Sequence, residues 1–152
     1  MKSTLPGAAA SMLLLGPGEA MGGGAGGASL TREALAAWLA GYELAWERRD
    51  PDAAAALFTA GASYHEMPFD EPIAGQDGIR AYWARVTADQ RDVDFQAKPV
   101  AVSGDTAVAE WTATFRLASS GATVDLDGVF VLTFDADGRC SSLLEWWHAR
   151  QR

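Results

Sequence analysis

From Val93 to the C-terminus the sequence consists of four extended runs separated by three short turns, and this pattern restricts the fold more than any other feature. The turns fall at 103–105, 119–121 and 135–138, where Ser, Asp and Gly gather. The runs between them are rich in β-branched and aromatic residues, which favour strands. Short turns join neighbouring antiparallel strands, so this half of the chain is predicted to form a four-stranded antiparallel meander.

Two of these runs alternate apolar and polar residues with the period of a strand, which places their apolar side chains on one face. The apolar positions are Ala109, Trp111, Ala113 and Phe115 in one run, and Leu126, Gly128, Phe130, Leu132 and Phe134 in the next. We expect the two apolar faces to lie side by side over a common core.

The residues before Val93 follow a helical period instead. Thr31 can cap a first helix that ends near Asp50, a short second helix covers 52–58, and a third covers 75–87, with an extended segment at 61–66. Because helices and strands are segregated rather than alternating, a doubly wound parallel fold is excluded. The prediction is an α+β fold in which a curved antiparallel sheet wraps around three N-terminal helices.

The length of 152 residues suits a single domain. Residues 1–28 are rich in Gly and are expected to be disordered, which leaves 29–152 as the folded domain. A secretory signal is the other interpretation of the N-terminus, but its n-region has one charge, Lys2, and its apolar run is short, which makes this interpretation the weaker one. The chain lacks the roughly twenty consecutive apolar residues of a membrane span, and a cytoplasmic protein is expected.

Charge and residue counts narrow the possible partners. A net charge of -8 argues against nucleic acid, which is bound by clustered Lys and Arg. His65 and His148 are too few to make a metal site, and the glycines lack the context of a phosphate-binding loop, so no metal and no cofactor are expected. Cys140, the single cysteine, lies among strand residues and is expected to be a buried thiol.

The segment GYELAWERRDPDAAAALFTAGASYHEMPFDEPIAGQDGIRAYW, residues 41–83, resembles the first half of nuclear transport factor 2-like (SnoaL-like) proteins and is similar to bacterial ketosteroid isomerase. The similarity covers about residues 30–150. It implies a cone-shaped fold with an apolar pocket, and a homodimer formed through the outer face of the sheet. The family is functionally mixed, with isomerases, cyclases, dehydratases, epoxide hydrolases and binding modules, so the fold does not imply one activity.

The resemblance assigns roles to individual positions. Tyr42 falls where the isomerase has the tyrosine that hydrogen-bonds the substrate oxyanion, and Glu66 falls at its carboxylate base. Phe130 replaces the protonated aspartic acid that completes that oxyanion hole. Loss of such a donor costs about 3 kcal/mol of transition-state stabilisation, which argues against steroid isomerisation itself. Glu145 and Trp147 fall on pocket-facing positions of the last strand, where a second carboxylate departs from the isomerase.

Each polar candidate has a structural alternative. Glu66 is either a general base in an apolar cavity, which would raise its pKa, or a rim carboxylate paired with Arg80. Glu145 is either a second acid or base, or one half of an ion pair with Arg139 or Arg150. Tyr42 either orients a substrate oxygen or holds Glu66 through its hydroxyl.

The predicted function is general acid–base chemistry, without a cofactor, on a small apolar substrate that carries a carbonyl, hydroxyl or epoxide group. Glu66, Tyr42 and Glu145 are the predicted catalytic residues, and the pocket is predicted to be shaped by Trp83, Trp111, Phe115, Phe130 and Trp147. The alternative is a binding or interaction module that uses the same cavity without turnover. Apolar residues among the acids of the outer sheet face, such as Val129 and Val131, favour a homodimer.

Overall fold

The structure is a computed structural model that describes residues 29–152; the predicted disorder of 1–28 lies outside the described residues. Helix α1 (Arg32–Arg48) begins where the Thr31 hydroxyl accepts a hydrogen bond from the Ala34 amide at 3.0 Å, which confirms the predicted cap. Helix α2 (Pro51–Ala56) and helix α3 (Gly75–Val86) also lie where helices were predicted.

The predicted meander is confirmed. Its four long strands are joined at the three predicted turns, and each pairs antiparallel with the next. A single six-stranded sheet results, in the order β2-β1-β6-β5-β4-β3. The strands are β1 (Phe58–His65), β2 (Ile73–Ala74), β3 (Gln90–Ser103), β4 (Thr106–Leu117), β5 (Thr123–Phe134) and β6 (Cys140–Gln151).

Two sequence-based expectations need correction. Phe58 was placed at the end of the second helix, but it is the first residue of β1, and its fully buried ring packs edge-on against Trp38. The sheet is not wholly antiparallel either, because β1 runs parallel to β6. These strands are distant in the sequence, so no turn pattern could report their pairing. The sheet is therefore mixed.

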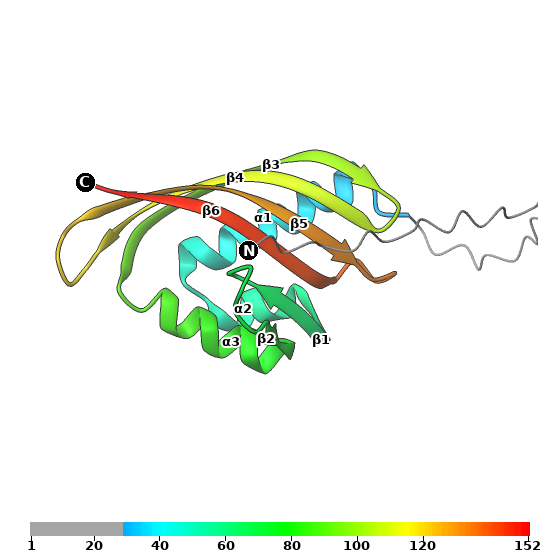
Figure 1. The fold of residues 1–152 in the computed structure, drawn as a ribbon, viewed down its shortest axis with the longest axis horizontal. Helices are drawn as coiled ribbons and strands as arrows, with labels where there is room; N and C mark the ends of the chain where they lie inside the picture. Colours follow the sequence, from blue (N-terminus) through cyan, green and yellow to red (C-terminus); the bar gives the residue numbers. More distant parts are fainter. Residues whose placement is uncertain (1–28) are drawn as a thin grey trace, which may run out of the picture.

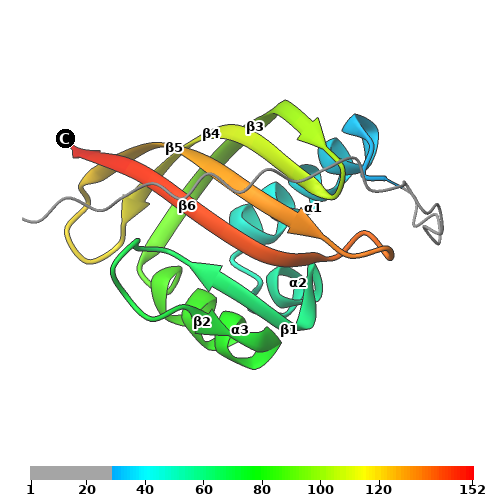
Figure 2. The same cartoon turned by 45° about the vertical axis from the view of Figure 1, so that its right-hand side comes forward.

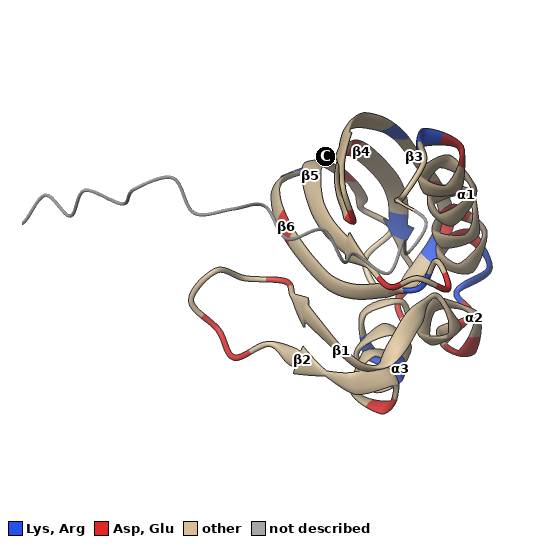
Figure 3. Ribbon diagram, turned by 90° about the vertical axis from the view of Figure 1, so that its right-hand side faces the viewer, with Lys and Arg blue, Asp and Glu red and all other residues tan. Residues whose placement is uncertain are grey.

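All three helices lie on one side of the curved sheet, as Figures 1 and 2 show. The long strands arch over α1, while α2 and α3 close the lower end beside β1. This arrangement is the α+β cone that the resemblance implied. Figure 3 shows acidic and basic positions spread over helices, loops and strands.

An aromatic cluster fills the concave side of the sheet. Trp111 stacks on Phe130 at 5.1 Å, and Tyr42 packs edge-on against Phe130 at 5.2 Å. The Trp111 ring lies over Gly128 on the adjacent strand, where an added Cβ would be only 2.6 Å from Trp111 Cζ2. Glycine at 128 thus permits the ring to lie flat against the sheet.

Candidate active site

A cavity of about 230 Å³ lies between α1, α3 and the concave face of the sheet. Its walls are mostly aromatic and aliphatic, with several polar groups among them. Of the eight predicted site residues, seven line it: Tyr42, Glu66, Trp83, Trp111, Phe115, Glu145 and Trp147. The eighth, Phe130, is fully buried behind Trp111 and does not line the cavity, so its part in shaping the pocket is indirect.

Larger hollows of about 400 and 470 Å³ lie on the outer face of the sheet. They are shallow and bordered by exposed ion pairs such as Lys98 with Glu110. We place the candidate site in the smaller cavity because it is more enclosed and is lined by two carboxylates among aromatic walls.

Glu145 is the most unusual residue of this cavity. It lies on the buried face of β6 and is only 6% exposed. Burial, and secondarily the nearby charge of Glu66, raises the pKa of Glu145 from 4.5 to about 8, while a hydrogen bond from Tyr64 opposes the shift. The Glu145 side chain is therefore mostly a neutral carboxylic acid at pH 7 and can donate a proton.

Two tyrosines connect Glu145 to α1. The Tyr64 hydroxyl donates to Glu145 Oε1 at 3.2 Å, and the Tyr42 hydroxyl lies 3.0 Å from that of Tyr64. Burial raises the pKa of both phenols well above the usual value, and the charge of Glu145 adds to the shift. Tyr42 thus contacts Tyr64 rather than holding Glu66, which corrects one of the two predictions for its hydroxyl.

Glu66 follows the last residue of β1, is half-buried and lines the same cavity. Its predicted alternative partner, Arg80, instead pairs with Asp52 and Asp77 at 2.6 Å each. Tyr82 of α3 lines the cavity beside Glu66. Burial, the charges of Glu145 and Glu66, and a hydrogen bond with Glu66 raise the pKa of Tyr82 above its usual value. Because Arg80 is engaged by Asp52 and Asp77, the predicted ion pair between Arg80 and Glu66 is wrong.

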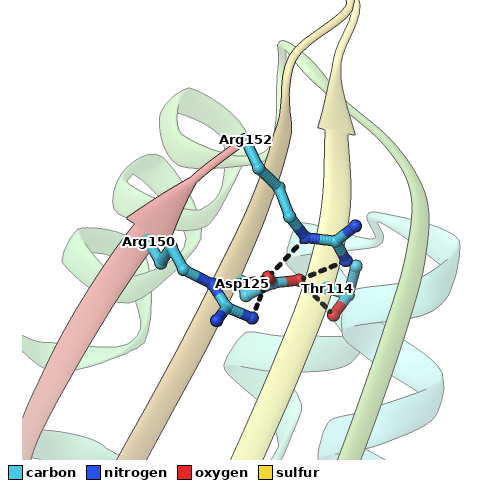
Figure 4. A network of polar contacts seen from close by, with 4 residues as sticks. All are labelled: Thr114, Asp125, Arg150 and Arg152. Carbon is cyan, nitrogen blue, oxygen red and sulfur yellow. Dashed lines mark hydrogen bonds and ion pairs between the residues drawn. The ribbon is translucent and has the colours of Figure 1, made fainter.

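Arg150, one of the two alternative partners predicted for Glu145, is also engaged elsewhere. Arg150 donates to Asp125 on the outer face at 2.8 Å, and Arg152 joins the same carboxylate, as Figure 4 shows. These hydrogen bonds, first from Arg152 and then from Arg150, lower the pKa of Asp125. Arg150 points away from the cavity, and no ion pair joins Glu145 to Arg139 or to any other cation of residues 29–152.

Four polar residues of the cavity were not predicted as site residues: Tyr64, Tyr82, Thr87 and Gln90. The Thr87 hydroxyl donates to the Trp83 carbonyl within the turn that ends α3, at 2.8 Å. Tyr64 shares a strand face with Glu66, and that alternation was the available signal for it. Tyr82 and Gln90 line the cavity from α3 and from the first position of β3, and no local pattern marks either one. They were missed because their roles depend on which distant elements lie opposite them.

Within residues 29–152, no three His, Cys, Asp or Glu side chains come together as a metal site would require. Cys140 is buried as predicted, and burial raises the pKa of its thiol to about 12. No helix in this part of the chain is long and apolar enough to cross a membrane.

Solved structures of similar fold share little sequence with the chain. RV0760c from Mycobacterium tuberculosis is 13% identical, with a TM-score of 0.68 over 81% of this chain and 99% of that one. The epoxide hydrolase/cyclase-like enzyme SalBIII, connected with pyran ring formation in the polyether salinomycin, is 19% identical, with a TM-score of 0.66 over 76% and 92%.

A third similar structure is a hypothetical protein of ketosteroid isomerase-like fold from Catenulispora acidiphila, in complex with trimethylamine. It is 18% identical, with a TM-score of 0.63 over 72% of this chain and 83% of that one. No curated protein matches the sequence. The family model of the SnoaL-like domain matches residues 35–143. The chain therefore belongs to the SnoaL-like domain family.

Proposed function

We propose that this protein is an enzyme without a cofactor that moves protons on a small, largely apolar substrate carrying a carbonyl, hydroxyl or epoxide oxygen. The observation that carries the proposal is the buried, mostly neutral Glu145 in one cavity with a second carboxylate, Glu66. A pair of carboxyl groups in different environments supplies one acid and one base. This pairing is the usual basis of acid–base catalysis at neutral pH.

Glu145 is the proton donor in this scheme. Tyr64 holds its carboxyl group at 3.2 Å, and the second tyrosine, Tyr42, orients Tyr64 in turn. A substrate oxygen in the cavity accepts the Glu145 proton as negative charge develops on it. Because burial disfavours the charged form of Glu145, the proton is readily recovered afterwards.

Glu66 is the proton acceptor. It is only half-buried and borders the same cavity, so its carboxylate is available to a substrate C–H, a substrate hydroxyl or a water molecule. Tyr82 of α3 lies on the cavity wall with it. A proton taken by Glu66 and one given by Glu145 balance an isomerisation, an elimination of water or the opening of an epoxide.

The size of the cavity limits the substrate. At about 230 Å³ it is smaller than the roughly 300–1,000 Å³ pockets that take drug-sized ligands. Its indole walls, Trp83 and Trp111, favour an apolar framework. The epoxide hydrolase/cyclase-like activity of SalBIII, on the same fold, is consistent with this class of chemistry.

The test is a panel of one substrate per reaction class: styrene oxide for epoxide opening, a β,γ-unsaturated cyclohexenone for isomerisation and a β-hydroxy ketone for dehydration. We expect turnover of at least one of them at pH 7. Turnover should fall about 100-fold or more in Glu145→Gln and in Glu66→Gln, because each amide keeps the shape but cannot exchange a proton. Glu110→Gln, on the outer face, is the matched control and should retain full activity.

The second candidate is a binding module that holds a small molecule without turnover. The hydrogen-bonded chain Tyr42–Tyr64–Glu145 is the observation that favours this module, because the same three groups can serve only to order the cavity wall. The similar protein in complex with trimethylamine is consistent with ligand binding on this fold. Saturable binding of the panel compounds with no turnover of any of them would support the module over the enzyme.

A further inference from the structure

Gln90, the first residue of β3, is a buried amide on the wall of the same cavity. Its side chain is not used by the acid–base scheme, and the residue is only 7% exposed. The indole Nε1 of Trp46 donates to Gln90 Oε1 at 2.7 Å. An indole nitrogen is a donor only, so the oxygen end of the amide must face Trp46.

This contact leaves the other end of the amide free. Gln90 Nε2 makes no hydrogen bond to residues 29–152, and unlike the indole nitrogens of Trp83 and Trp111 it is not a fully enclosed donor, so its surface is partly accessible. Because Gln90 borders the cavity, the NH₂ group is the part available to a molecule inside it. A donor without a protein acceptor, held in place by Trp46, suits an oxygen acceptor on a ligand.

The amide and the acid occupy separate positions along the cavity. Trp46, which holds Gln90, and Tyr42, which leads to Glu145, are four residues apart in α1. Their Cα atoms are therefore about 6 Å apart along the helix axis. Both rings pack edge-on against Trp83, at 5.7 and 5.1 Å, so apolar surface lies beside both polar groups.

We propose that Gln90 is a specificity-determining residue that donates from Nε2 to a second oxygen of the substrate. The substrate class is then a small molecule with two oxygen functions separated by an apolar framework, one an acceptor for Gln90 and the other at Glu145. The role of the oxygen at Glu145 rests on the proposed function, whereas the contact of the other oxygen with Gln90 concerns binding alone.

The test compares two ketones with the same number of heavy atoms by calorimetric titration at pH 7. In para-diacetylbenzene the second group is an acetyl, and in para-isopropylacetophenone an isopropyl group replaces it without the oxygen. The measured quantity is the ratio of the two dissociation constants. We expect Gln90→Met to weaken binding of the diketone about 3- to 10-fold relative to binding of the isopropyl ketone, as loss of one hydrogen bond implies.

Two further variants complete the design. Trp46→Phe keeps the Gln90 donor but removes the group that fixes its orientation, so the ratio should move the same way by a smaller factor. Gln96→Met, on the exposed face of the same strand, should leave the ratio unchanged. If Gln90→Met is unfolded by circular dichroism, the ratio in Trp46→Phe decides.

If folded Gln90→Met has the same ratio of dissociation constants as the wild-type protein, the role of Gln90 is overturned. If Gln90→Met is unfolded, a wild-type ratio in Trp46→Phe overturns it instead. Failure of the wild-type protein to bind either ketone at millimolar concentration overturns it as well. These outcomes are distinct from failure of the acid–base proposal, which is read from turnover in the Glu145 and Glu66 variants.

Discussion

The raised pKa of Glu145 makes the stability of the protein depend on pH in an unusual direction. The carboxyl group titrates near 4.5 in the unfolded chain and near 8 in the folded protein. Between these values the folded state holds a proton that the unfolded state has lost. The free energy of unfolding therefore falls as pH rises, by about 1.4 kcal/mol per pH unit.

Across the full interval from pH 4.5 to about 8, this slope amounts to about 5 kcal/mol, which is an upper value. From pH 5 to 7.5 the loss is about 3 kcal/mol, a large fraction of the stability of a small domain. The contribution is fully present below pH 4.5 and is lost as pH passes through 8.

Glu145→Gln should abolish this slope, because the amide is neutral at every pH and its oxygen still accepts the Tyr64 hydrogen bond. The variant should match the wild-type protein at pH 5 and exceed its stability at pH 8. Glu66→Gln should keep the slope but end it at a lower pH, since the charge of Glu66 is the second cause of the shift.

The assay is urea unfolding followed by tryptophan fluorescence at pH 5, 6, 7 and 8, with Glu110→Gln as the control that retains the wild-type slope. A wild-type stability that is flat over this range would refute the reasoning. An equal slope in Glu145→Gln would do so too, since the titrating group would then lie elsewhere.

Three other outcomes follow from the structure. Gly128→Ala should destabilise the fold by about 1–3 kcal/mol in urea unfolding, because the new methyl group would meet the Trp111 ring; a neutral effect would contradict that packing. Asp125→Asn should lower the melting temperature at pH 7 but much less at pH 2, since a lowered pKa stabilises fully above the unfolded value of 3.8 and progressively less below it, where the unfolded chain binds the proton first. We also propose a homodimer through the outer face around Val129 and Trp146, which are 39% and 49% exposed and pair across the strands; a monomer in light scattering at micromolar concentration would exclude it.

Much of the fold was predictable because it rests on local patterns. The cap at Thr31, the helical period of α1 and α3, and the three turns of the meander are each encoded within a few neighbouring residues. Alternation along β4 and β5 also identified the buried face of each strand. The parallel pairing of β1 with β6 was not predictable in this way, since no turn joins the two strands.

The candidate site likewise has features that local sequence patterns predict and features that depend on distant contacts. The sequence by itself predicted that Glu66 and Glu145 face the apolar side, from alternation and the family resemblance, and both line the cavity although β1 ends one residue before Glu66. Only the tertiary structure decided their partners: Tyr64 for Glu145, and Asp52 and Asp77 rather than Glu66 for Arg80. The physical reason is that a strand position specifies a face, whereas a pKa and a hydrogen bond depend on the distant elements that close over that face.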